Sequence, residues 1–179
     1  MPKTRKLCKI PISERELELP KTQFVEIVRI AEESKDIISL GPGEPDFVTP
    51  KHIRNFAKKQ LDLGKTHYTA IGGLSEVKVS LAKKLKRENR IDADPETQVV
   101  VTAGAKEAIL LSLMALLDPG ESAVVPNPGY LAYIPMVDSL NGKPISVQLK
   151  PDEGWEYDLE RVKKQITNKT ILLILNSPS

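Results

Sequence analysis

The segment that decides the fold of this chain covers residues 98–108, which read Gln98-Val99-Val100-Val101-Thr102-Ala103-Gly104-Ala105-Lys106-Glu107-Ala108. The apolar run from Val99 to Val101 is typical of a buried strand, and small residues separate it from a helical pattern that begins at Lys106. Such a turn presents unpaired backbone N–H groups at a helix start, where they can bind an anion. The alternative is an ordinary tight connection in which Gly104 supplies a positive φ angle. The segment alone leaves both interpretations open.

From this segment toward the C-terminus, predicted strands and helices alternate. Strands are expected at 98–102, 123–125, 145–149 and 170–175, and helices at 106–117, 131–140 and 159–166. This alternation predicts an α/β fold with a largely parallel sheet that is covered on both faces. Loops that follow the carboxyl ends of parallel strands build ligand sites, and the sequence ends inside one such loop.

Toward the N-terminus, helical spacing predicts helices at 24–31, 52–63 and 75–89, and a short strand is expected at 37–40. Pro50 stands where the second of these helices could start, and Gly64 follows its end. In the third helix the apolar face is expected to consist of Val77, Leu81 and Leu85.

Composition excludes several classes of protein. The 179 residues carry a net charge of +2 with basic and acidic residues intermixed, which argues against nucleic-acid binding. No apolar run is long enough to span a membrane. Cys8 is the single cysteine, so no disulfide framework is expected, and a cytoplasmic location is predicted. Neither His52 nor His67 has a metal-ligand partner at suitable spacing, so no metal site is expected.

A second candidate segment is Pro126-Asn127-Pro128-Gly129-Tyr130-Leu131-Ala132-Tyr133, which also joins a predicted strand to a predicted helix. An aromatic side chain just after a strand can lie flat against a planar ligand. The simpler interpretation is that Tyr130 and Tyr133 are packing residues of the helix.

Together these segments resemble class I aminotransferases of the aspartate aminotransferase type. Gly43-Glu44-Pro45-Asp46-Phe47 is similar to that family's opening G-E-P-D-F motif, and Asn176-Ser177-Pro178-Ser179 is similar to the start of its N-x-P-x-N-P-T-G motif. Four further motifs lie between them in the family's order, at residues 68–74, 102–108, 116–121 and 126–133.

The resemblance implies the type I pyridoxal-phosphate (PLP) transferase fold, in which a large α/β domain has a mixed, mostly parallel sheet with flanking helices. Residues 1–36 would form an N-terminal arm and a small-domain segment, and residues 37–179 the N-terminal part of the large domain. The cofactor would be PLP. The resemblance implies that Gly104, Ala105 and Lys106 bind the cofactor phosphate and that Tyr130 stacks on the cofactor ring. It also implies that Tyr68 makes a contact across a dimer interface and that Gly43 binds the substrate carboxylate.

The implied activity is amino-group transfer between an L-amino acid, with an aspartate-type donor expected, and a 2-oxo acid, by a homodimer. A PLP-dependent lyase with the same fold and a non-catalytic fragment are the alternatives. In the resemblance, the lysine that binds the cofactor covalently would follow residue 179, so no residue of the chain is assigned as catalytic and the chain alone is expected to be inactive.

Overall fold

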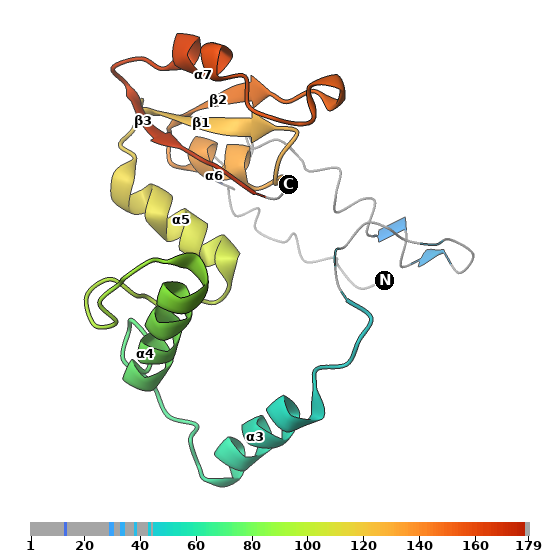
Figure 1. Ribbon diagram of the computed structural model, residues 1–179, viewed down its shortest axis with the longest axis vertical. Coiled ribbons are helices and arrows are strands. Elements are labelled where there is room, and N and C mark those ends of the chain that lie inside the picture. The colour runs from blue at the N-terminus through green and yellow to red at the C-terminus, as the bar shows by residue number, and fades with distance from the viewer. Residues whose placement is uncertain are drawn as a thin grey trace, which may run out of the picture. The chain divides into compact units, whose positions relative to one another are not determined.

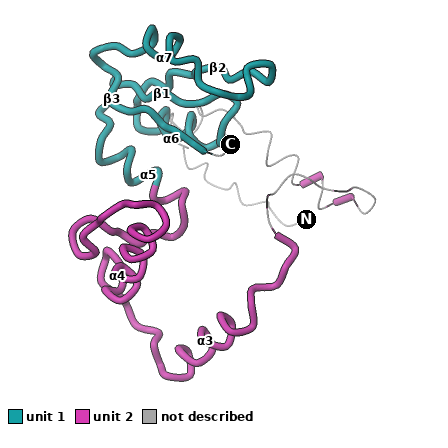
Figure 2. Tube along the Cα trace, viewed as in Figure 1, with its two compact units in different colours: residues 1–23, 109–179 teal, residues 24–108 magenta. Residues whose placement is uncertain are grey.

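The computed structural model describes residues 45–177 together with Ser13, Arg29, Ile30, Glu33, Ser34, Ile38 and Gly43 (Figure 1). The chain divides into two compact units, here called unit 1 (residues 1–23 and 109–179) and unit 2 (residues 24–108) (Figure 2). The helix predicted at 24–31, the strand at 37–40 and the domain boundary near residue 36 fall mostly outside the described residues. The predicted boundary therefore stays a prediction.

Unit 1 contains a three-stranded parallel sheet in the order β2-β1-β3. Its strands are β1 (Ser122–Asn127), β2 (Lys143–Gln148) and β3 (Thr170–Leu173). Helix α6 (Tyr133–Ser139) connects β1 to β2, and helix α7 (Leu159–Gln165) connects β2 to β3 after the short 3-10 helix η2 (Pro151–Glu153). These elements confirm the predicted alternation, although β3 ends at Leu173 and α6 begins at Tyr133.

The core of unit 1 lies on both faces of β1, because successive strand residues point in opposite directions. On one face Ala123 packs with Val137 of α6 and with Leu113 and Leu117. On the other face Val124 packs with Val147 of β2 and Val162 of α7. Helices α6 and α7 accordingly cover opposite faces of the sheet (Figure 1).

Unit 2 contains helix α3 (Lys51–Asp62) and helix α4 (Ser75–Lys84), which continues into the π-helical turn η1 (Leu85–Asn89). Both predicted helices are confirmed. Pro50 occupies the cap position before α3, and Gly64 adopts a φ of +71° just after it, as expected of residues that start and end a helix. Helix α5 (Ala105–Leu116) begins in unit 2 and continues into unit 1.

The predicted apolar face of α4 is largely exposed in the described structure. Val77 and Leu81 are 41% and 38% exposed, whereas Lys78 is only 7% exposed. The Lys78 ammonium donates to the Glu96 carboxylate at 2.9 Å, so the side chain is buried with its charge compensated. Helical spacing identifies the helix but not which of its faces meets the following loop.

The strand expected at residues 98–102 is also absent from the described structure. A strand requires a laterally hydrogen-bonded neighbour. Here the Val101 N–H instead donates to the Gly72 carbonyl oxygen at 3.0 Å. A Cβ atom added to Gly73 would lie 2.7 Å from the Val101 side chain, so a glycine allows this loop to approach the 98–102 segment closely.

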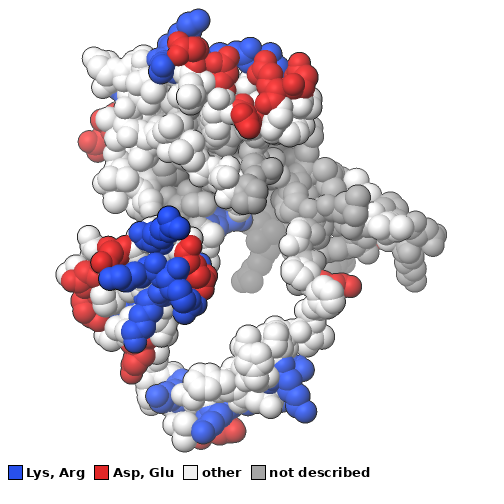
Figure 3. All heavy atoms as spheres, in the orientation of Figure 1, with Lys and Arg blue, Asp and Glu red and all other residues white. Residues whose placement is uncertain are grey.

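Basic side chains gather over α4 and η1, with acidic side chains beside them (Figure 3). Lys84 lies 3.4 Å from Glu88, and Lys86 lies 2.9 Å from Asp92. These basic side chains are therefore paired with acidic ones on a solvent-exposed surface. None of the helices in the described part of the chain is long and apolar enough to cross a membrane.

Candidate active site

The turn before α5 has a nearly complete set of internal hydrogen bonds. The Gly104 N–H donates to the Thr102 carbonyl oxygen at 2.8 Å, and Gly104 itself has a φ of +89°. The Gly104 carbonyl oxygen accepts from the Thr102 hydroxyl at 2.9 Å and from the Ala108 N–H at 3.3 Å. The Glu107 carboxylate accepts from the Ala103 N–H. Both ends of the turn are therefore fixed by side chains of the same segment.

The first N–H groups of α5 have no carbonyl acceptor within the helix; they belong to Ala105, Lys106 and Glu107. They have no hydrogen-bond partner among the described residues. A Cβ atom added to Gly104 would meet no other atom within 4 Å, so the space beside the turn is open. Free donors at the positive end of a helix next to open space can bind an anionic group such as a phosphate.

The aromatic pair of unit 1 follows the carboxyl end of β1. The rings of Tyr130 and Tyr133 meet edge to face with centroids 5.4 Å apart. Tyr133 is 7% exposed, so the packing interpretation is correct for it. Tyr130 is 44% exposed and presents a ring at the edge of the sheet where parallel α/β folds bind ligands. Of the two tyrosines, only Tyr130 is free to contact a ligand.

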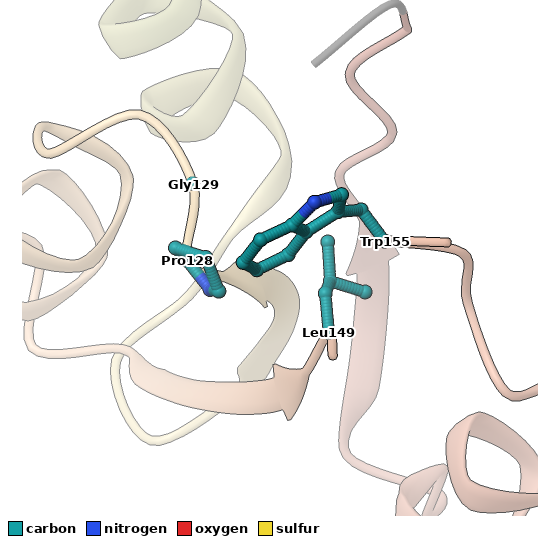
Figure 4. Close-up of a pocket in the computed structure, with 4 residues that line it drawn as sticks. All are labelled: Pro128, Gly129, Leu149 and Trp155. Atoms are coloured by element: carbon teal, nitrogen blue, oxygen red, sulfur yellow. The ribbon is translucent and has the colours of Figure 1, made fainter. Parts of the chain in front are cut away.

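A pocket of about 310 Å³ is lined by Leu149, Trp155 and the two residues that directly precede Tyr130, Pro128 and Gly129. The Trp155 indole extends over Leu149 toward Pro128 (Figure 4). Trp155 adopts a φ of +61°, which is uncommon for a bulky residue. A Cβ atom added to Gly129 would lie 2.6 Å from the Pro126 carbonyl oxygen, so the tight bend before Tyr130 requires glycine.

The remaining predicted site residues are placed separately. Tyr68 lies in the loop between α3 and α4 with a fully exposed side chain, and Gly43 is exposed with open space around its Cα. Among the described residues, no hydrogen bond joins Tyr68 or Gly43 to the turn at 102–108. No cluster of His, Cys, Asp or Glu suited to a metal occurs in the part of the chain that the structure describes.

Sequence reasoning missed the two side chains that fix the turn. Thr102 and Glu107 were part of the quoted segment, but no role followed from their identity alone. The available signal was an acidic residue in the first turn of a helix, where glutamate often reaches back to a preceding N–H group. Trp155 lies in none of the sequence motifs, so nothing in the sequence singled it out.

Residues 35–179 match the family described as aminotransferase class I and II. The chain belongs to this family. Among curated members it is 44% identical over 149 residues to the aspartate aminotransferase of Pyrococcus abyssi, and this match covers 83% of the chain and 38% of that protein. It is 40% identical over 150 residues to aromatic-amino-acid aminotransferase 2 of Thermococcus litoralis, covering 84% of the chain and 39% of the relative.

Solved structures of the family have the same fold. The aspartate aminotransferase of Thermus thermophilus with maleate aligns with a TM-score of 0.88 at 34% identity, over 95% of the chain and 45% of that structure. This match confirms the predicted aspartate aminotransferase-type α/β fold. The chain spans less than half of the length of the family members that it matches here.

Proposed function

We propose that the protein carrying this sequence is a PLP-dependent aminotransferase that transfers an amino group between an L-amino acid and a 2-oxo acid, with aspartate as the expected donor. The observation that carries the proposal is the turn at 102–108, whose free N–H groups border open space in a chain of this family. Relatives named aspartate aminotransferase support the choice of donor.

Each of the predicted site residues has the chemistry that its proposed role toward the cofactor or substrate requires. The N–H groups of Ala105 and Lys106 would donate to the phosphate, while Gly104 keeps the approach open. The exposed ring of Tyr130 would stack on the pyridine ring, and Gly43 would lie against the substrate carboxylate. When bound, PLP supplies an electron sink for the electrons of the substrate's Cα–H bond. The role of these residues is to hold and orient it.

The activity is tested with the full protein, PLP and 2-oxoglutarate, using aspartate, alanine and aromatic amino acids as separate donors. We expect glutamate formation with aspartate as the donor to be faster than with the others. Release of ammonia from a donor without glutamate formation would instead identify a lyase. Absence of any PLP absorbance in the purified protein would contradict both.

We also propose a homodimer in which Tyr68 contacts the cofactor phosphate of the partner subunit. The full exposure of the Tyr68 side chain supports this role, because it leaves the hydroxyl available to another chain. Tyr68→Phe is expected to weaken PLP retention without changing the sedimentation coefficient. A fully active monomer in sedimentation experiments would refute the proposal.

A polypeptide of residues 1–179 alone is proposed to be inactive, because the resemblance assigns none of its lysines to the covalent cofactor position. Borohydride treatment with PLP is expected to label surface lysines at scattered sites, and one stoichiometric adduct would contradict this. The single cysteine supports a reducing compartment, and we infer a cytoplasmic location that cell fractionation can check.

A further inference from the structure

In the turn at 102–108, some backbone N–H groups are paired within the segment and others are not. The first N–H groups of a helix have no partner within the helix, and in this exposed turn they are accessible to a ligand. The N–H groups of residues 103 and 104 are both satisfied inside the segment, by the Glu107 carboxylate and the Thr102 carbonyl oxygen. The donors left over start at Ala105. The Glu107 side chain and the Thr102 main-chain carbonyl thereby separate the donors used to shape the turn from those available to an anion.

We propose that Thr102 and Glu107 are positioning residues that hold this turn ready for the cofactor phosphate. The inference rests on the proposed function and deepens it. The Thr102 hydroxyl fixes the Gly104 carbonyl oxygen from one side at 2.9 Å, and Glu107 fixes the Ala103 N–H from the other. A glycine with φ +89° has wide conformational freedom, so external bonds are needed to keep its neighbours' N–H groups pointing in one direction.

The position of Glu107 has an electrostatic consequence. Its carboxylate bonds to the same turn that would receive a phosphate, and like charges close together repel. Its contribution therefore comes from its acceptor oxygen and not from its charge. Glutamine keeps an acceptor oxygen without the charge, whereas alanine removes both, so the two variants separate the two effects.

The experiment measures binding of pyridoxine 5′-phosphate and of pyridoxine to the full protein by calorimetry. These ligands lack the aldehyde, so their binding does not depend on any lysine. The ratio of the two dissociation constants reports the phosphate contacts alone, and a general loss of folding would affect both ligands. Glu121→Ala is the matched control, because the Glu121 carboxylate accepts from the Asp118 N–H at 2.8 Å in a turn of unit 1.

We expect Glu107→Ala and Thr102→Val each to reduce the phosphate preference about three- to tenfold, the effect of one lost hydrogen bond. Thr102→Ser and Glu121→Ala should leave it unchanged, and Glu107→Gln should leave it unchanged or increase it. An unchanged preference in Glu107→Ala and Thr102→Val, or a Glu107→Gln variant as weak as Glu107→Ala, overturns the inference. If the wild-type protein binds pyridoxine and pyridoxine 5′-phosphate with nearly equal dissociation constants, the proposed function is overturned as well.

Discussion

The two units of the chain bury their apolar residues to very different extents. In unit 1, five of the six residues of β1 are buried, and Val124, Val125, Val137 and Val147 are inaccessible to solvent. In the described part of unit 2, helix α3 buries no residue, although its apolar and polar residues segregate strongly around the helix axis. Phe56 on that helix is 65% exposed.

The difference shows that helix formation and burial are decided by different features of the sequence. In unit 1, α6 connects the adjacent strands β1 and β2, and α7 connects β2 to β3 on the other side of β1, so both helices return to the sheet that they cover. In unit 2, α3 and α4 are separated by a loop and share no comparable sheet among the described residues. Amphipathic spacing predicts a helix in both units, but burial depends on the partner.

The largest expected effect is that of Val124→Ala in the centre of unit 1. Val124 is completely buried between β2 and α7, and removal of two methyl groups should cost about 2–3 kcal/mol of unfolding free energy. Trp155 is the only tryptophan of the 179 residues and lies in unit 1, so in a polypeptide of these residues its fluorescence during urea unfolding reports this unit. A change below about 0.5 kcal/mol, the range of surface substitutions, would show that unit 1 is not the stable region.

A smaller effect is expected for Lys78→Met in unit 2. The Lys78 hydrogen bond is the largest cause of the lowered pKa of Glu96, followed by a hydrogen bond from the Ser75 side chain. A lowered carboxyl pKa stabilises the folded state above the unfolded-state pKa, and this stabilisation is lost as the pH falls through the folded-state pKa. The variant should therefore be less stable than wild type at neutral pH, with the difference disappearing in acid.

Circular dichroism during unfolding, at neutral and at acid pH, measures this difference in stability through the loss of the helices. Glu96→Gln is the matched control, since it keeps an acceptor for Lys78 but cannot titrate. A wild-type advantage over Lys78→Met that is equal at neutral and acid pH would mean that packing of the lysine stem, and not the ion pair, is responsible.

The smallest effect is expected for Phe56→Ser on α3. Because Phe56 is mostly exposed, the substitution should change the unfolding free energy by about 0.5 kcal/mol or less. Urea unfolding followed by circular dichroism provides the measurement. A loss as large as that of Val124→Ala would show that the apolar face of α3 is covered in solution, and the contrast between the units would no longer hold.

The sequence was sufficient where the signal is local. Pro50 and Gly64 bracket α3, as their positions in the sequence predicted. The continuous apolar run of β1 predicted a strand buried on both faces. For the candidate site, the family motifs predicted cofactor contacts at the turn of Gly104 and at the ring of Tyr130, and these roles stay predictions.

The sequence was insufficient where a result depends on distant partners. Residues 98–102 have strand-like composition but no lateral neighbour in the described structure, and Lys78 is buried because Glu96 neutralises it. The roles of Thr102 and Glu107 depend on the path of the turn in three dimensions. The pocket at Trp155 requires a left-handed backbone conformation that a bulky side chain rarely adopts.

The central position of β1 has a consequence for synthesis of the chain. This strand is completed at Asn127, but its two neighbours end at Gln148 and Leu173. At a translation rate of roughly 5–20 residues per second, its valines wait on the order of seconds for their second neighbour to leave the ribosome. An apolar, β-branched segment without a partner is prone to pair with other chains. The nascent protein is thus most vulnerable to aggregation during the interval in which its future core is already made but not yet enclosed.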